Sequence, residues 1–492
     1  MSAPANAQPS TGPIDVPEAS DPPQFGAAEK LAIWLLLGSA FVVILNETIM
    51  GVALPHLMTD LDITAAAAQW LTTVFLLTMS VVIPITGMLI QRYRTRSLFI
   101  TAMSLFTLGT LVAAMAPGFG VLVIARAVQA SGTAIMMPLL MTTVVTLVPE
   151  RQRGRLMGRI AIVISVAPAL GPTISGLILQ WLTWRWMFIL VLPIAVFALV
   201  AGTVRMPNVG TQRRARIDLI SVVLSVVAFG GLVYGLSLVG EAASADELVP
   251  PWVPVVVGAA ALALFIWRQL RLQREDRALL DLRTFRTRPF ALSTILFGFC
   301  SIALFGTLIL LPIYMQNVLG YATLETGLML LPGGLLMGLL GPVVGRAVDA
   351  RGARSMLLPG TVLTALALWA MTLLGDQTSL WQVLATHLLL SVGLAGTFTP
   401  LFSVALGSLP PKLASYGSAT ISTVQQVGGA AGTALFVTIM TLVSTTAAGS
   451  PEAVDPHALA AGTRAAFMVG GIAATASIVL AFFIREEPRR VS

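Results

Sequence analysis

Apolar segments of about 20 residues recur along nearly the whole chain, and each has the length that a helix needs to cross a bilayer. The 492 residues contain fourteen such segments. They lie at 31–55, 66–90, 97–116, 119–147, 157–181, 185–204, 217–240, 252–270, 289–313, 325–348, 355–375, 380–408, 417–443 and 465–485. Charged residues make up 10% of the chain, whereas soluble domains carry about 25%. The sequence therefore predicts an all-α polytopic membrane protein.

The basic residues predict how these spans are oriented. If the N-terminus is inside the cell, all of the 29 lysine and arginine residues except Arg126, Arg185 and Arg464 fall on the cytoplasmic side. Because loops rich in lysine and arginine stay on the cytoplasmic side, we expect a multi-pass protein of the plasma (inner) membrane with both termini cytoplasmic. Residues 1–30 are polar and lack the basic start of a signal peptide. We expect them to form a disordered cytoplasmic tail, and 486–492 to form a second tail.

Two similar loops indicate an internal repeat. Residues 87–96 and 345–354 each begin with glycine, carry a polar residue four positions on, and continue with arginines. Both loops follow the second span of a group of six. The sequence thus predicts two six-helix bundles, at 31–204 and 289–485, with two extra spans and a cytoplasmic linker at 205–288. In such two-half proteins the substrate cavity lies between the halves, near the middle of the bilayer.

Ionisable residues inside a span mark the expected functional centre. Glu47 is the only ionisable residue in its apolar segment, and Arg126 lies within the fourth. A charge at this depth costs several kcal/mol and is functional by default. We expect Glu47 to bind and release a proton, with Arg126 stabilising its charged form. The alternatives are a static Glu47–Arg126 pair that locks two spans together, or a packing arginine bonded to backbone carbonyls.

Other polar residues at midspan are candidates for a substrate cavity. We expect Asn46, Gln129, Gln425 and Gln426 to line it. For the two adjacent glutamines, simple hydrogen bonds between helices are an equal alternative. We interpret His387, which has no evident partner in the sequence, as structural.

The fifth span, 157–181, combines small residues with prolines, including Pro168, Gly171, Pro172 and Gly176. Small residues let helices approach closely, and proline bends them. Periodicity alone leaves two readings open: a gate at the interface between the halves, or ordinary small-residue packing.

Four motifs together resemble the major facilitator superfamily, specifically its fourteen-span drug:proton antiporter group typified by QacA and EmrB. Residues 45–55 resemble LDxTxVNVALP of the first span, and 126–132 resemble RxxQGxG of the fourth. Residues 167–176 resemble the antiporter motif GxxxGPxxGG of the fifth span. The loops 87–96 and 345–354 resemble GxLxDRxGRR.

The resemblance implies the major facilitator fold and a set of roles. The matching arginine, Arg126, is linked to proton transfer, and the fifth-span motif favours gating and export. The repeated loops are expected to latch the inner side through charged residues, with topology-setting charge as the alternative. These residues are Arg92, Asp349, Arg351 and Arg354.

The chain departs from the family pattern at three places. Asn46 stands where the first-span aspartate is usual, and Glu47 follows it. A shift of one residue rotates a side chain by about 100° around a helix. Gln91 and Arg94 replace the aspartate and glycine of the first loop, which weakens the expectation of a gating contact there.

The predicted function is a proton-driven multidrug efflux antiporter that exports amphipathic, often cationic compounds by alternating access. We expect no enzyme activity, no cofactor other than the proton gradient, no metal and no nucleic-acid partner. The expected partners are small amphipathic substrates, protons and the lipid bilayer, and the chain is expected to be monomeric. An exporter of a single native metabolite, lipid or siderophore and a proton-coupled importer stay open. A membrane enzyme or sensor is disfavoured, because no catalytic cluster is evident.

Overall fold

The fourteen expected spans correspond to fourteen long α-helices. The computed structural model describes residues 26–63, 65–148, 150–208, 218–241, 250, 252–449 and 455–484. The helices are α1 (Ala27–Asp60), α2 (Ala65–Arg92), α3 (Thr95–Ala114), α4 (Phe119–Leu147), α5 (Glu150–Trp181), α6 (Arg185–Arg205), α7 (Leu219–Glu241), α8 (Trp252–Leu272), α9 (Arg288–Asn317), α10 (Thr323–Arg351), α11 (Arg354–Met371), α12 (Leu380–Gly407), α13 (Ala414–Ala448) and α14 (Pro456–Phe483). The described residues also form three short 3₁₀ turns: η1 (Gln273–Glu275) and η2 (Leu282–Arg286) lie between α8 and α9, and η3 (Pro411–Leu413) lies between α12 and α13. All fourteen α-helices are long and apolar enough to cross a membrane, so the predicted all-α polytopic fold is confirmed.

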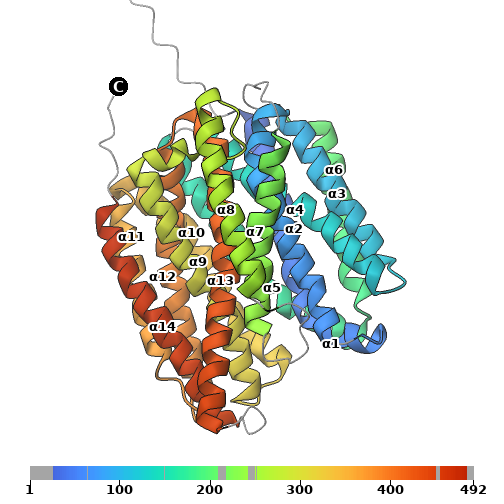
Figure 1. Cartoon of the computed structure of the whole chain (residues 1–492), viewed down its shortest axis with the longest axis vertical. Helices are drawn as coiled ribbons and strands as arrows, with labels where there is room; N and C mark the ends of the chain where they lie inside the picture. The colour runs from blue at the N-terminus through green and yellow to red at the C-terminus, as the bar shows by residue number, and fades with distance from the viewer. Residues whose placement is uncertain are drawn as a thin grey trace, which may run out of the picture.

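Helices α1–α6 and α9–α14 repeat one packing pattern. The contacts α1–α5, α3–α4 and α3–α6 in the first group recur as α9–α13, α11–α12 and α11–α14 in the second. In Figure 1, α3 and α6 form one edge of the molecule and α11 and α14 form the opposite edge. The bundle boundaries near residues 204 and 289 stay a prediction, and most of the expected N-terminal tail and all of the C-terminal one lie outside the described residues.

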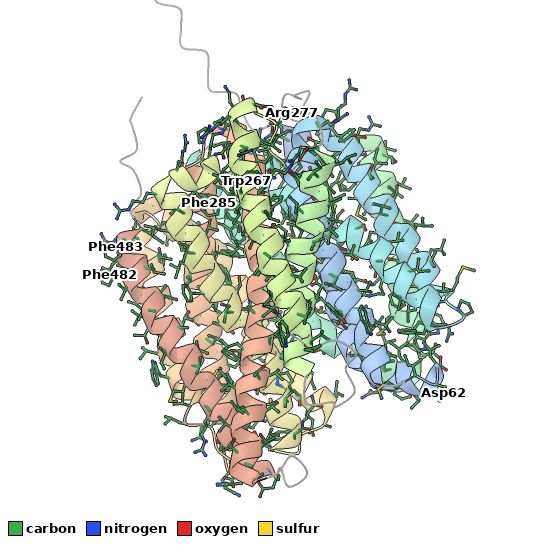
Figure 2. The ribbon with its side chains drawn as sticks, in the orientation of Figure 1. Asp62, Trp267, Arg277, Phe285, Phe482 and Phe483 are labelled. Atoms are coloured by element: carbon green, nitrogen blue, oxygen red, sulfur yellow. The ribbon has the colours of Figure 1, made fainter. Side chains whose placement is uncertain are left out.

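The outer surface of the bundle is apolar and its two ends are polar. Side chains such as Trp267, Phe482 and Phe483 are about half exposed and project outward in Figure 2. Such a surface would be a liability in water and suits a lipid environment. Figure 2 also shows Arg277 at one end of the bundle and Asp62 at the other. We call the first the arginine-rich end, because the α2–α3, α8–α9 and α10–α11 loops lie there and carry many of the arginines.

The extra helices α7 and α8 cover the seam between the two halves. Helix α7 packs on both α2 and α13, one from each half, and Figure 1 shows α7 and α8 across the front of the bundle. The linker that follows α8 inserts Leu279 and Leu280 into an apolar cluster formed by side chains of four helices. These side chains are Met88, Phe229, Phe265, Tyr416 and Ala419.

A polar network fixes this linker at the arginine-rich end. Arg268 donates two hydrogen bonds to Asp218, at 2.7 and 2.8 Å, and the Ser221 hydroxyl donates to the same carboxylate at 2.6 Å. Gln269 donates to the Ser221 hydroxyl at 2.8 Å, and its carbonyl oxygen accepts from the backbone N–H of Leu279 at 2.7 Å. The hydrogen bonds from Arg268 hold the pKa of the Asp218 carboxyl well below its usual range.

We predict that Asp218→Asn destabilises the folded protein by about 1–3 kcal/mol, because it weakens charge-assisted hydrogen bonds that are largely shielded from water. Thermal unfolding in detergent measures the effect. Since the Asp218 pKa is lowered in the folded state, its contribution is fully present above the ordinary carboxyl pKa, so the loss should be equal at pH 5 and pH 8. Asp62→Asn, at an exposed carboxylate, is the control. An unchanged midpoint for Asp218→Asn would contradict this role.

Candidate functional site

A buried arginine organises the middle of the first helix group. Arg126 on α4 is completely buried. Its Nη1 donates to the side-chain oxygens of Gln129, at 2.7 Å, and Asn46, at 3.2 Å. Its Nε donates to the carbonyl oxygen of Leu71 at 3.4 Å, and the guanidinium lies 4.1 Å from the centre of the Phe75 ring. The described acceptors of this cation are thus neutral amide and carbonyl oxygens.

The network continues from α4 to α3. The Gln129 amide nitrogen donates to the Thr110 hydroxyl at 2.8 Å, and that hydroxyl donates to the carbonyl oxygen of Phe106 at 2.7 Å. Gly132 allows this, because a Cβ atom there would overlap the backbone of α3 at Ala102. Gly132 and Gln129 of the fourth-span motif therefore both serve the contact between α3 and α4.

Asn46 and Gln129 do not line the cavity as expected from the sequence. Both are completely buried, and neither belongs to the wall of the central cavity. The reason is that Arg126 takes the side-chain oxygen of each. The direct Glu47–Arg126 ion pair considered as an alternative is not present either. Asn46 is the α1 partner of Arg126, and Glu47 interacts with it only through longer-range attraction.

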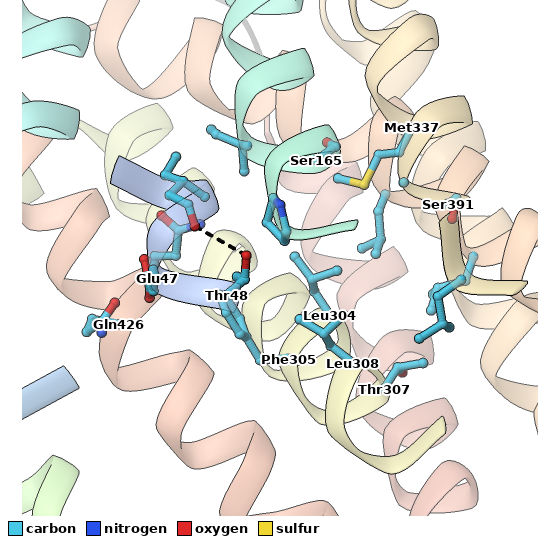
Figure 3. A pocket seen from close by; sticks show the side chains of 18 of the residues that line it. Glu47, Thr48, Ser165, Leu304, Phe305, Thr307, Leu308, Met337, Ser391 and Gln426 are labelled. Carbon is cyan, nitrogen blue, oxygen red and sulfur yellow. Dashed lines mark hydrogen bonds between the residues drawn. The ribbon is translucent and has the colours of Figure 1, made fainter. Parts of the chain in front are cut away.

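Glu47 lies on the wall of a cavity between the two helix groups. The cavity has about 1150 Å³ of space free of protein atoms, part of it open to solvent. Its lining comes from both groups and includes Glu47 on α1, Pro168 on α5, Leu304 on α9 and Gln426 on α13. Among the described residues, no side chain forms a hydrogen bond or an ion pair with the Glu47 carboxylate. Figure 3 shows Glu47 beside Gln426 at one side of the cavity.

Gln425 and Gln426 line the cavity through side chains that make no hydrogen bond within the described part of the chain. This arrangement favours contact with a ligand over the alternative of hydrogen bonds between helices. Most of the remaining wall is apolar and includes Met79, Met137, Phe305 and further leucine and methionine residues. Flexible methionines suit a site that accepts ligands of different shapes.

The sequence reading missed the polar residues of α9 and α12 in this wall. His387, interpreted as structural, lines the cavity together with Ser391 and Thr307. The ring Nε2 of His387 lies 3.2 Å from the carbonyl oxygen of Leu330. A spacing of four residues places His387 and Ser391 on one face of a helix, and this pattern in an apolar span was the available signal.

Helix α5 contacts α10 of the other half near both ends. At the arginine-rich end Gly158 and Gly341 lie so close that a Cβ on either would overlap the carbonyl oxygen of the other. Toward the opposite end the Thr173 hydroxyl donates to the carbonyl oxygen of Gly327 at 3.4 Å, and Gly176 faces Leu324.

The predicted gating residues of α5 occupy different places. Pro168 lies on the cavity wall, and Gly171 packs so tightly on Thr48 of α1 that a Cβ would overlap its hydroxyl. Pro172 lies within α5, but its side chain is not described. The small residues of this span thus make close contacts with both α1 and α10. Their role as a gate stays a prediction.

Further contacts between the halves gather at the arginine-rich end. Gln91 on α2 donates to the Lys412 carbonyl oxygen at 3.1 Å and to the Ser415 hydroxyl at 2.9 Å. The hydroxyls of Thr142 and Ser418 lie 2.6 Å apart. Gln91 stands where the family motif has an aspartate, and its amide joins the two halves through these hydrogen bonds.

The predicted charged latch is placed at the same end. Arg92 ends α2, Asp349 and Arg351 lie in the last turn of α10, and Arg354 begins α11. The Arg354 guanidinium lies 5.8 Å from the centre of the Phe482 ring, which belongs to the same half. Gly352, with φ of 83°, ends α10 in a conformation that other residues rarely adopt. Switching by these charges stays a prediction.

Among the described residues, no group of three or more His, Cys, Asp or Glu side chains is arranged to hold a metal ion. The chemistry available in the cavity is therefore that of one carboxylate, one imidazole, two primary amides and several hydroxyls. These groups can bind ligands and protons, but they form no nucleophile–base pair of the kind used in hydrolysis.

Known proteins are similar to this chain in sequence and in fold. Residues 36–433 match the family described as Major Facilitator Superfamily. The chain is 41% identical over 460 residues to "Lincomycin resistance protein LmrB" of Listeria monocytogenes, and this alignment covers 93% of this chain and 96% of the relative. It is 30% identical over 433 residues to "Multidrug resistance protein B homolog" of Mycobacterium tuberculosis, covering 84% of this chain and 79% of the relative. The solved proton:xylose symporter XylE superposes with a TM-score of 0.63 at 13% identity, over 93% of this chain and 96% of that one.

Many membrane transporters are built from two similar halves of membrane-spanning helices around a central cavity, and the family match and the relatives make this chain a transporter and not an enzyme. The matches make the class specific, and the chain belongs to the Major Facilitator Superfamily. The resemblance seen in the four motifs is thereby confirmed.

We predict that Gly158→Ala lowers transport at least about tenfold at unchanged membrane insertion. The added methyl group meets the backbone of Gly341, and backbone atoms cannot yield as a flexible side chain can, so α5 and α10 have to separate at the arginine-rich end. Transport per inserted molecule is the measurement. Gly38→Ala, where a Cβ meets no atom within 4 Å, is the matched control. Wild-type transport by Gly158→Ala would show that this contact is unimportant.

Proposed function

We propose that this protein is a proton-coupled antiporter that exports amphipathic, cationic compounds across the plasma membrane by alternating access. The arginine-rich end faces the cytoplasm, as do both termini, and the chain acts as a monomer. The observation that supports this function is the Glu47 carboxylate on the wall of a cavity between the two halves, without a hydrogen-bond or ion-pair partner among the described residues.

The coupling follows from the energetic cost of that carboxylate. A charged carboxylate in a largely apolar wall is unfavourable unless a positive charge approaches it or a proton neutralises it. Either a proton or a cationic substrate meets this need, and they compete for one site. A substrate entering from the cytoplasm displaces the proton, and a proton entering from outside displaces the substrate. Such competition produces exchange without any covalent step.

Arg126 supports this exchange by remaining where it is. Its bonds to Asn46 and Gln129 keep a positive charge near Glu47 but do not let that charge neutralise the carboxylate in a close pair. Glu47 therefore stays available to ligands in the cavity. In an alternating-access cycle, the contacts of Gln91 and Gly158 at the arginine-rich end are broken while the substrate enters from the cytoplasm. They form again before the substrate is released outside the cell.

The names of the relatives support export of drug-like molecules. The relative at 41% identity is named for lincomycin resistance and the one at 30% for multidrug resistance. Resistance by transport requires removal of a compound from the cell. The apolar, methionine-containing wall of the cavity supports a substrate range that is broad in shape.

We predict that Glu47→Gln abolishes substrate-induced proton release, because glutamine keeps the size of the side chain but cannot carry the proton. The measurement is the pH inside everted vesicles, reported by a fluorescent dye after addition of substrate. Glu325→Gln, which alters an exposed carboxylate that caps the start of α10, is the matched control. Wild-type proton movement by correctly inserted Glu47→Gln would remove this residue from the mechanism.

A further inference from the structure

The cavity has polar groups at two separate places. In Figure 3, Glu47 and Gln426 lie on one side, whereas Thr307 and Ser391 lie on the opposite side, beyond Leu304. The first place is formed by α1 and α13, and the second by α9 and α12. A ligand that reaches both has to cross an apolar middle region.

The second polar place has unused hydrogen-bonding capacity. Thr307 is 2% exposed, and its hydroxyl has no hydrogen-bond partner in the described part of the chain. The Nδ1 atom of His387 is buried and equally without a partner there. Of the residues that carry such unpartnered buried atoms, these two are the ones that line the cavity.

The helical backbone does not by itself force the Thr307 hydroxyl to lack a hydrogen-bond partner. Many threonines in these helices donate the hydroxyl hydrogen to a carbonyl oxygen one turn earlier, as Thr364 does to Gly360 and Thr463 does to Leu459. Some do not, and of the threonines with an unpartnered buried hydroxyl, Thr307 is the one on the cavity wall in the described part of the chain. A buried hydroxyl that forgoes this bond costs about 1–3 kcal/mol. A ligand that supplies the missing partner regains that free energy on binding.

We propose that the cavity selects two-ended ligands: a protonated amine at Glu47 and a hydroxyl- or amide-bearing end at Thr307, Ser391 and His387. This proposal rests on the proposed function and specifies its substrate class. The Thr307 hydroxyl can donate and accept. The Ser391 hydroxyl already donates to the carbonyl oxygen of His387 at 2.9 Å and can still accept, and Nδ1 of His387 is an acceptor when Nε2 carries the hydrogen toward the Leu330 carbonyl oxygen. The site thereby distinguishes hydroxylated amines from lipophilic cations that form no hydrogen bonds.

The site distinguishes the two kinds of cation because one of them leaves buried hydrogen-bonding groups of the protein without partners. A lipophilic cation satisfies Glu47 and the apolar middle region, but it leaves the Thr307 hydroxyl and Nδ1 of His387 without partners. Sites built to hydrogen-bond a ligand disfavour analogues that lack the matching group. Both kinds of cation are thus bound, but only the hydroxylated amine depends on Thr307 and Ser391.

The test is equilibrium binding to the purified full-length protein with two probes. Lincomycin is an amine with a hydroxylated sugar, and tetraphenylphosphonium is a cation without hydrogen-bonding groups. Thr307→Val removes the hydroxyl at constant shape, and Ser391→Ala is the second variant. Each is expected to weaken lincomycin binding about fivefold or more, the effect of one lost hydrogen bond, with tetraphenylphosphonium binding unchanged. Thr463→Val, a buried threonine of α14 outside the cavity wall, is the control and should change neither.

Each other result overturns the proposal. Equal weakening of both probes would indicate a general packing effect, and unchanged lincomycin binding in both variants would show that this end is not used. Binding of neither probe by the wild type would contradict the substrate class as well. The proposed antiport is judged separately by proton release, so a protein that binds lincomycin through Thr307 but moves no protons would retain the two-ended site and lose the exchange mechanism.

Discussion

A guanidinium group in the middle of an apolar bundle has to be hydrogen-bonded, and the way Arg126 meets this requirement determines the rest of the site. It takes oxygens from Asn46, Gln129 and Leu71 and stacks near Phe75. These partners are all neutral, and the Nη2 atom of Arg126 has no hydrogen-bond partner in the described part of the chain, so no carboxylate is in close contact with this cation. The neighbouring Glu47 is thus left on the cavity wall, where we propose that it exchanges protons for substrate.

Small residues connect this centre to the ends of the molecule. Gly171 lets α5 pack on Thr48, one residue from Glu47, and Gly158 lets the same helix pack on α10. The same helix therefore touches both the residue next to the carboxylate and the contact between the halves. The pair α7–α8 adds a cover on the seam, through its contacts with α2 and α13.

The membrane fold could be predicted because span length and the distribution of arginines are properties of the sequence alone. The site was harder to predict, because neighbouring residues on a helix point about 100° apart. Only the tertiary structure shows that Asn46 faces Arg126 and that Glu47 faces the cavity. Gln91 was judged by the aspartate it replaces, although an amide can also bond across an interface. His387 was interpreted as structural because the sequence shows no partner for it, although its spacing of four residues from Ser391 in an apolar span indicated a shared polar face.

The most direct test of the account is an infrared difference spectrum of the purified protein on addition of a cationic substrate. A neutral carboxyl group absorbs separately from a carboxylate, so the spectrum reports the loss of a proton from one side chain. The account predicts that substrate removes a protonated-carboxyl band in the wild type and in Glu325→Gln, and that Glu47→Gln lacks this band. A band that persists in Glu47→Gln, or a wild-type spectrum in which substrate changes no carboxyl band, would contradict it.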